Sequence, residues 1–254
     1  MLIRVIRGKT FFMNNYKLLI QYDGTDYAGW QYQLNAVTIQ QKITESIKIL
    51  LNEDVNLIGS GRTDAGVHAL GQVANFTTAQ ELDLFRFRYS LNSILPNDIS
   101  VIDIQKVSLD FHARFSAKKR SYLYLISKNK SPFFYRYSYF YHGYLNCEKL
   151  NHLSKSFLGE HDFTSFCKKN SETENKVCII YNAHWKETKG MVIFLIEADR
   201  FLHGMVRTIV GTVLHAVKNN LDEFFINKIL EERDRETAGE SVPAKGLFLY
   251  KVKY

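Results

Sequence analysis

The sequence predicts an α+β fold in which the element order β-α-β-β-α-β occurs twice. Three observations lead to this prediction. Short segments alternate apolar and polar residues, longer segments repeat apolar residues every three or four positions, and glycine, proline or capping residues separate the segments. With 254 residues, of which 46% are hydrophobic, the chain is long enough for one large domain or two closely packed ones.

The first half of the chain begins with a strand predicted at residues 17–22. Thr38 and Gln41 have the spacing of a capping box and predict the start of a helix. One face of this helix carries Ile39, Ile43, Ile47 and Leu50. Pro96 must end a second helix, because proline cannot continue the hydrogen bonding of a helix interior. The apolar residues of the second helix are Leu84, Phe87, Leu91, Ile94 and Leu95. Further strands are predicted at residues 55–60, 72–77 and 100–107.

The second half repeats this order with one additional helix. Asn146 is the predicted N-cap of a helix at residues 147–157. A long helix is expected from about residue 201 to 217, with Met205, Ile209, Val213 and Ala216 along it. Strands are predicted at 120–126, 177–185, 191–198 and 247–254, and the additional helix at 222–232. The repeated order indicates two ferredoxin-like or RRM-like units.

The charge and cysteine content narrow the possible functions. A formal net charge of +7 and a pI near 9.1 favour a polyanionic partner. Cys147, Cys167 and Cys178 form no C-x-x-C pair, so we expect neither a zinc site nor disulfides, and a reduced cytoplasmic setting. No apolar run is long enough to span a bilayer, so no membrane segment is expected. Phosphate-binding loops, dinucleotide-binding fingerprints and clustered metal ligands are missing from the sequence, so no cofactor and no metal are predicted.

The segment Gly61-Arg-Thr-Asp-Ala-Gly-Val-His68 is the strongest candidate for a functional site. It lies between two predicted strands and places the Asp64 carboxylate between two glycines, which permit a tight turn and close approach of a ligand. Arg62 can hold this carboxylate ionised or attract an anionic substrate. From spacing alone, a polar turn without catalytic function is the more common explanation of such a segment.

A longer stretch around Asp64 resembles the active-site segment of the tRNA pseudouridine synthase A family. The similarity continues in order from about residue 16 to the C-terminus. The similar segments are Tyr22-Asp-Gly-Thr-Asp-Tyr-Ala-Gly-Trp-Gln31, Ser60-Gly-Arg-Thr-Asp-Ala-Gly-Val-His-Ala-Leu-Gly-Gln-Val-Ala-Asn-Phe76, Phe111-His-Ala-Arg-Phe-Ser116, Tyr122-Leu-Tyr124, His161-Asp-Phe163, Phe201-Leu-His-Gly-Met-Val-Arg207 and Pro243-Ala-Lys-Gly-Leu247. The resemblance implies that the two halves share a mixed, mainly antiparallel sheet, with an active-site cleft between them.

The resemblance also implies roles for five residues. Asp64 would be the catalytic carboxylate, and Arg207 would pair with it and keep it ionised. Tyr122 would stack on a flipped uracil, Leu247 would close the uracil pocket, and Arg62 would help to displace the target base.

The residues by themselves allow simpler explanations of the same positions. Arg207 lies off the apolar line of its helix by two residues, as an ordinary surface arginine would. Tyr122 and Tyr124 share one face of a strand and could both be core residues. Leu247 could simply begin the last strand, and Arg62 could stabilise its turn by a bond to the backbone.

Asp23, Trp30 and His68 also have expected roles. The family's first motif, with Asp23 and Trp30, implies a loop that contributes to RNA binding and to the wall of the cleft. A buried Trp30 that anchors the loop is an equal alternative. His68 is expected to pack or hydrogen-bond behind the Asp64 loop.

The expected domain boundaries are residues 16–112 for the first half and 113–254 for the second. Residues 1–15 would form an N-terminal extension that is disordered or precedes the true start at Met13. The extension contains Arg4, Arg7 and Lys9 but no continuous apolar segment, so it is not predicted to be a secretory signal. A short basic arm that contacts RNA and a transit peptide are the alternatives.

The sequence therefore predicts a cofactor-free enzyme that isomerises uridine to pseudouridine in the anticodon stem-loop of tRNA, at positions 38, 39 and 40. The resemblance further implies a homodimer. Two alternatives are a paralogue with the same chemistry acting on ribosomal RNA, and a non-catalytic RNA-binding protein with an RRM-like fold.

Overall fold

The computed structural model describes residues 3–6, 9–169 and 173–254, and its chain divides into two compact units. Unit 1 comprises Met1–Lys118 together with Lys251–Tyr254, and unit 2 comprises Lys119–Tyr250. The last strand, β12 (Leu247–Lys253), therefore contributes residues to both units.

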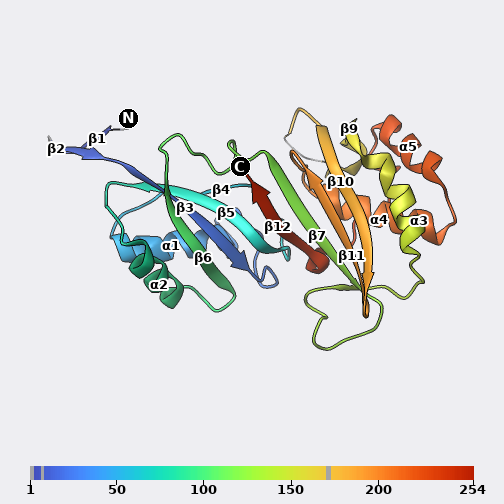
Figure 1. Ribbon diagram of the computed structural model, residues 1–254, viewed down its shortest axis with the longest axis horizontal. Coiled ribbons are helices and arrows are strands. Elements are labelled where there is room, and N and C mark those ends of the chain that lie inside the picture. Colours follow the sequence, from blue (N-terminus) through green and yellow to red (C-terminus); the bar gives the residue numbers. More distant parts are fainter. Residues whose placement is uncertain (1–2, 7–8, 170–172) are drawn as a thin grey trace. The chain divides into compact units, whose positions relative to one another are not determined.

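Unit 1 contains antiparallel strands and two helices that contact each other (Figure 1). Its elements are β1 (Ile3–Ile6), β2 (Lys9–Phe12), β3 (Asn14–Tyr22), α1 (Ile39–Leu51), β4 (Ile58–Gly59), β5 (His68–Thr78), α2 (Leu84–Ile94) and β6 (Ile99–Val107). The strand order is β6-β3-β5-β12, with β4 paired to β5, while β1 and β2 form a two-stranded sheet. The register places Leu18 of β3 opposite Ala74 of β5 and Ile104 of β6.

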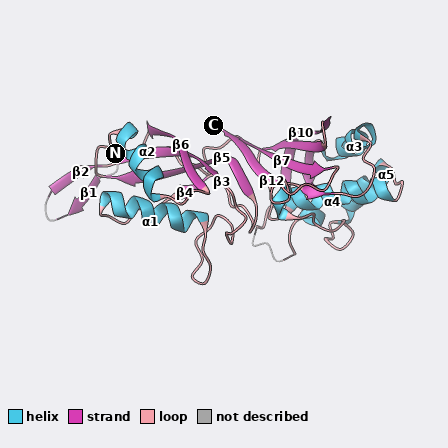
Figure 2. Cartoon of the chain, turned by 90° about the horizontal axis from the view of Figure 1, so that it is seen from below, coloured by secondary structure: helices cyan, strands magenta, loops and turns pink. Residues whose placement is uncertain are grey.

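Unit 2 repeats this plan with additional elements. These are β7 (Lys119–Ser127), β8 (Tyr139–Phe140), α3 (Cys147–Ser154), β9 (Gly159–Asp162), β10 (Val177–Thr188), β11 (Met191–Ala198), α4 (Met205–Lys218) and α5 (Glu223–Glu232), followed by β12. The strand order is β12-β7-β11-β10-β9, and β8 pairs in parallel with β7. The helices α3, α4 and α5 contact one another, and Figure 2 shows them grouped together.

The strand orders confirm the predicted fold class. In unit 1, β3 lies between β6 and β5, and in unit 2, β7 lies between β12 and β11. In both units the first strand of the β-α-β-β-α-β order thus lies between the fourth and the third, as expected for a ferredoxin-like unit. In unit 1 the second strand, β4, is reduced to two residues, shorter than the segment 55–60 predicted from sequence. The α+β class and the mainly antiparallel sheet are thus confirmed, whereas the cleft between the halves stays a prediction.

The helix start predicted at Thr38 is confirmed. The Thr38 side chain accepts a hydrogen bond from the Gln41 backbone N–H, and Ile39, Ile43 and Ile47 are fully buried. Leu51 rather than Leu50 completes the buried face, because Leu51 lies four residues after Ile47 and so on the same side of the helix. The helix ends at Leu51, and Asn52 adopts a left-handed conformation with φ 53°.

Two helix boundaries in unit 2 differ from the sequence prediction by about three residues or more. α4 begins at Met205 instead of residue 201, because Gly204 adopts a φ of +73°, which a helix cannot include. α3 ends at Ser154, and residues 155–157 continue as a 3-10 turn. Asn146 caps α3 as predicted, since its side chain accepts hydrogen bonds from the N–H groups of Glu148 and Lys149.

Across the described ranges, every helix falls short of the length and apolar character that crossing a membrane requires.

Candidate active site

Asp64 lies on the loop between β4 and β5, as the sequence predicts. Asp64 itself is half-buried, whereas its neighbours Thr63 and Val67 are buried. The Val67 N–H donates a hydrogen bond of 3.1 Å to the Asp64 carbonyl, and Gly66 has a φ of +74°. These features close a tight turn directly after the carboxylate, so the backbone path through Asp64 is fixed by local geometry.

The segment 22–31 forms hydrogen bonds with the Asp64 loop. The Trp30 N–H donates to the Thr63 carbonyl at 3.1 Å, and the Gly66 N–H donates to the Tyr27 carbonyl at 3.3 Å. The hydroxyls of Tyr22 and Thr63 lie 2.8 Å apart in a buried hydrogen bond. Two stretches of chain about forty residues apart in sequence are therefore hydrogen-bonded on both sides of Asp64.

Gly29 permits this close approach. Its φ is +97°, and a Cβ atom at this position would lie 2.5 Å from the Thr63 carbonyl oxygen. At Gly24, a Cβ atom would collide with the Val67 carbonyl. The glycines of this segment therefore have a packing function against the Asp64 loop.

Gln72 holds the other end of the loop. It is fully buried, and its Oε1 accepts a hydrogen bond of 2.6 Å from the Ser60 hydroxyl. Its Nε2 donates to the Gly61 carbonyl at 3.0 Å. These bonds tie the beginning of the loop to β5. They also satisfy the Gln72 amide, which would be costly to leave unpaired in this buried position.

The structure shows where the remaining residues of these two segments lie. Trp30 is 3% exposed and packs against Gly59, so it is a buried anchor. His68 is buried, and its Nδ1 accepts a hydrogen bond of 3.0 Å from the Gly24 N–H, which confirms the expected position behind the loop. Arg62 is exposed, and within the described part of the chain no hydrogen bond or ion pair of its side chain is found. The turn-stabilising bond considered for Arg62 is therefore not seen.

Three predicted site residues belong to unit 2. Arg207 lies in the first turn of α4, and its Nε donates a hydrogen bond of 2.7 Å to the Val242 carbonyl. Tyr122 on β7 is 8% exposed and meets Phe201 edge to face, with ring centroids 5.1 Å apart. Leu247 is buried and begins β12.

The segment 242–246 connects Arg207 with Tyr124. The Tyr124 hydroxyl donates to the Pro243 carbonyl at 2.8 Å, and the Tyr124 ring lies against Gly246. Burial raises the pKa of Tyr124 well above its usual value, and the positive charge of Arg207 opposes this shift. Tyr124 is therefore a neutral core residue, as the sequence suggests, that supports the chain next to Arg207. The pairing of Arg207 with Asp64 stays a prediction.

Sequence reasoning missed the positioning function of Tyr22, Tyr27 and Gln72. A signal was present for Gln72, because a glutamine at a core-facing position of a buried strand requires hydrogen-bond partners. Tyr22 and Tyr27 stood within the first motif, but their partners lie about forty residues away, and no local pattern reveals them.

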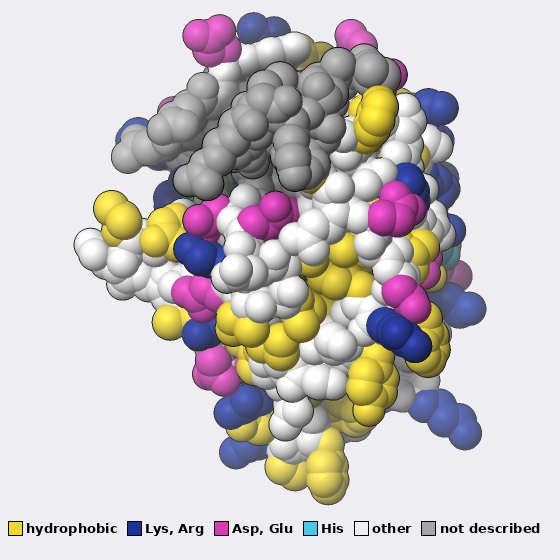
Figure 3. All heavy atoms as spheres, turned by 90° about the vertical axis from the view of Figure 1, so that its left-hand side faces the viewer, with side chains coloured by type: hydrophobic (Ala, Val, Ile, Leu, Met, Phe, Trp, Pro, Cys, Tyr) yellow, Lys and Arg dark blue, Asp and Glu magenta, His cyan; other side chains and the backbone are white. Residues whose placement is uncertain are grey.

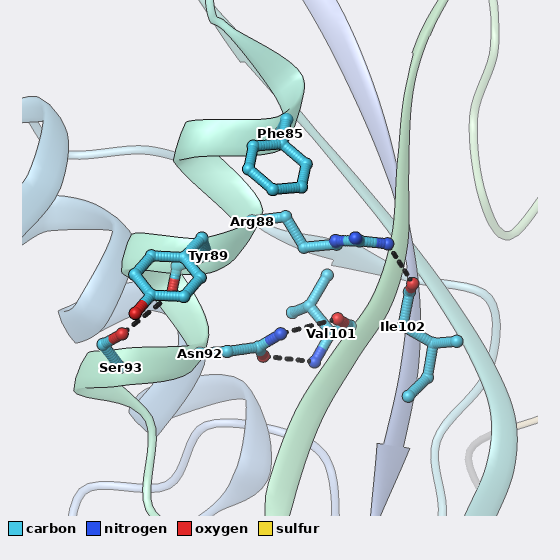
Figure 4. A pocket seen from close by; sticks show the side chains of 7 residues that line it. All are labelled: Phe85, Arg88, Tyr89, Asn92, Ser93, Val101 and Ile102. Atoms are coloured by element: carbon cyan, nitrogen blue, oxygen red, sulfur yellow. Dashed lines mark hydrogen bonds between the residues drawn. The ribbon is translucent and has the colours of Figure 1, made fainter.

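A cavity of about 400 Å³ lies elsewhere in unit 1, between α2 and β6. Figure 4 shows its lining, in which Arg88 and Asn92 donate hydrogen bonds to the carbonyls of Ile102 and Val101. None of the predicted site residues lines this cavity. Over the described residues, no group of three or more His, Cys, Asp or Glu side chains is placed to hold a metal ion.

Comparison with known proteins identifies the family. The family model for tRNA pseudouridine synthase matches residues 18–116 and 153–254. The chain belongs to the tRNA pseudouridine synthase family. Relatives named tRNA pseudouridine synthase A include one from Caldicellulosiruptor bescii, 45% identical over 95% of this chain and 100% of its own length. Others come from Clostridium acetobutylicum, 41% identical with the same coverage, and Bacteroides thetaiotaomicron, 40% identical over 95% of this chain and 91% of its own.

Membership in the tRNA pseudouridine synthase family confirms the predicted enzyme class, an RNA pseudouridine synthase. Both matched ranges include site candidates: Asp64 and Arg62 lie in the first, and Arg207 and Leu247 in the second. Among solved structures, a chain of a Cbf5-Nop10-Gar1 complex is similar with a TM-score of 0.37 and 13% identity, covering 78% of this chain and 53% of that one.

Proposed function

We propose that this protein converts uridine to pseudouridine in tRNA and that Asp64 is the catalytic group. The observation that carries the proposal is the Asp64 loop, whose backbone is hydrogen-bonded on both sides by buried residues while Asp64 stays half-buried. Catalysis gains most from groups held in place before the substrate arrives, and this loop has that character. Relatives of nearly the same length are named tRNA pseudouridine synthase A.

The proposed reaction needs one well-placed carboxylate. The N1–C1′ bond of uridine breaks, the base turns, and a C5–C1′ bond forms. The proton leaves C5 and N1 gains one, so there is no net oxidation and no cofactor is required. Asp64 would act either as a nucleophile toward the base or ribose, or as the base that removes the C2′ proton.

The unit 2 residues would support this chemistry. Arg207 would keep Asp64 ionised, and its bond to Val242 supports this role because it anchors the guanidinium. Tyr122 would replace the stacking that a flipped uracil loses, and its contact with Phe201 holds the ring in place. Leu247 would close the pocket, and the exposed Arg62 would fill the space that the flipped base leaves.

The finer parts of the proposal concern substrate, assembly and location. We expect uridines 38, 39 and 40 of the anticodon stem-loop as targets, a homodimer as the assembly and the cytoplasm as the location. The net charge of +7 supports a tRNA partner, because Lys and Arg side chains release counterions when they meet phosphates.

Tritium release tests the proposal. A tRNA transcript labelled with tritium at C5 of uridine should release label with the parent protein, because C5 loses its proton in the reaction. Asp64→Asn should release at least about 10³-fold less label while it still binds the transcript. Asp54→Asn is the matched control, since this carboxylate is 83% exposed and pairs with Lys48, and it should behave like the parent.

The possible results separate the parts of the proposal. Full activity of Asp64→Asn would exclude Asp64 as the catalytic group. Release from ribosomal RNA but not from tRNA would overturn the substrate. Binding of both RNAs by the parent without any release would overturn the catalytic function.

A further inference from the structure

The connection between β7 and α3, residues 128–146, carries an unusual number of exposed aromatic rings. We call it the aromatic loop. Five of its rings are exposed: Phe133 81%, Phe134 49%, Tyr135 55%, Tyr137 37% and Tyr144 83%. Exposed apolar side chains gathered in one place usually mark a binding surface rather than a structural need.

The aromatic loop is held in place although its rings are exposed. Its strand β8 pairs with the end of β7, and the Tyr141 N–H donates to the Ser127 carbonyl at 3.2 Å. The buried Ser138 donates a hydrogen bond to the Phe134 carbonyl at 2.9 Å. The rings are thus presented on a fixed backbone, which lowers the entropy lost when a ligand binds.

Charge indicates the kind of ligand. The aromatic loop contains Lys128, Lys130, Arg136 and His142 but no Asp or Glu. Lys128 pairs with Glu187 at 2.5 Å, while Lys130 and Arg136 are exposed. The Arg136 guanidinium lies 5.8 Å from the Tyr135 ring centroid. Aromatic rings interleaved with cations bind single-stranded nucleic acid, because rings stack on bases and cations meet phosphates.

The exposed hydrophobic side chains of α2 and β6 provide a contrast. Phe85 and Tyr89 are each 70% exposed there. The ion pairs Arg86–Asp83 and Lys106–Glu81 bring both signs of charge to this region of unit 1. Figure 3, which looks onto the side of unit 1 at the left of Figure 1, shows hydrophobic side chains bordered by acidic and basic ones. Acidic side chains are therefore present in this region, whereas the sequence of the aromatic loop contains none.

We infer that the aromatic loop binds unpaired bases of the RNA substrate by stacking, as a second contact besides the uracil pocket. The inference rests on the proposed function. The position of the aromatic loop within unit 2 supports the inference. The loop follows Ser127, the last residue of β7, which lies five residues beyond Tyr122 and therefore about 17 Å from it along the strand. Nucleotides flanking a base on Tyr122 can span such a distance.

A double variant tests the inference. Phe133→Ala with Tyr144→Ala removes the two most exposed rings of the aromatic loop, and the fold should tolerate their loss. We expect the Kd for an unmodified tRNA transcript, measured by fluorescence anisotropy, to rise by about ten-fold or more. The dependence of Kd on salt should keep its slope, because stacking releases no counterions. Phe85→Ala with Tyr89→Ala is the matched control and should leave Kd unchanged.

A fully paired RNA duplex of the same length completes the test. Its Kd should be the same for the parent and the aromatic loop variant, because it offers no unpaired bases. An unchanged Kd for tRNA, or an equal loss for the duplex, would overturn the inference. A change in the sedimentation of the free protein would overturn it as well and would assign the loop to contacts between copies. Tritium release by the parent, measured alongside, tests the proposed function separately.

Discussion

Single residues around Asp64 determine the backbone path through the candidate catalytic loop. Thr63, Gly66 and Val67 each contribute a hydrogen bond within three residues of Asp64, and two of these bonds lead to the segment 22–31. A carboxylate in a freely moving turn would lose most of the advantage of its position. The glycines that allow this contact are therefore as informative about the site as the charged residues.

Gly29→Ala should show how strongly the loop depends on this contact. The substitution combines an unfavourable φ of +97° with a Cβ atom 2.5 Å from the Thr63 carbonyl oxygen. We expect the free energy of unfolding in urea to fall by about 3 kcal/mol or more, and tritium release to fall on the order of 100-fold.

Gly190→Ala is the matched control for the backbone strain. Gly190 has a φ of +78°, but a Cβ atom there would meet nothing within 4 Å. It should cost only about 1 kcal/mol, the usual penalty of a left-handed residue, with activity unchanged. Equal losses for the two variants would mean that the contact with Thr63 contributes nothing.

At the scale of elements, the helix ends explain which boundaries the sequence predicts. Thr38 and Asn146 cap their helices through their own side chains, so a local pattern in the sequence is sufficient. The start of α4 depends instead on the backbone conformation of Gly204, which apolar periodicity does not report. This shift places Arg207 in the first turn of α4, where its side chain donates a hydrogen bond to the Val242 carbonyl. This bond explains why Arg207 lies outside the line of apolar residues on the helix.

Thr38→Ala should destabilise unit 1 through its first helix. Loss of the side-chain bond to the Gln41 N–H should lower the free energy of unfolding by about 1 kcal/mol, measured by urea denaturation. Thr44→Ala, the same substitution in the middle of α1, is the control and should be neutral or slightly stabilising, because alanine favours helix interiors. A larger loss for Thr44→Ala would contradict the capping function of Thr38.

At the scale of the whole molecule, the excess of basic residues concerns the partner rather than the fold. A net charge of +7 accounts for attraction to any polyanion and gives no sequence preference. Base contacts such as those proposed for Tyr122 and the aromatic loop would add selectivity for a particular RNA.

Affinity for tRNA should fall steeply with salt. Between 50 and 200 mM salt we expect the Kd to rise between about ten-fold and 10³-fold, because each phosphate contact releases counterions. The measurement is an anisotropy titration at four salt concentrations, with a neutral osmolyte at matched osmolality as the control. A Kd that hardly changes would mean that the basic residues face away from the RNA.

Much of the fold followed from local patterns. The order of the long strands and helices, two helix caps and the loop that carries Asp64 were predicted because they depend on periodicity and on neighbours within four residues. The short strands β1, β2, β8 and β9 were not predicted. The family and the enzyme class followed from the similarity of whole segments, which the comparisons confirm. The roles of Asp64, Arg207, Tyr122, Arg62 and Leu247 stay predictions.

The sequence by itself determined the α+β class, the repeated element order and the position of Asp64 between two strands. Only the tertiary structure decided that the segment 22–31 holds the Asp64 loop, that Gln72 ties its beginning to β5, and that β12 contributes to both units. The physical reason is the range of the interactions. Caps and periodicity act within a few residues, whereas these contacts join groups that only the folded chain brings within hydrogen-bonding distance.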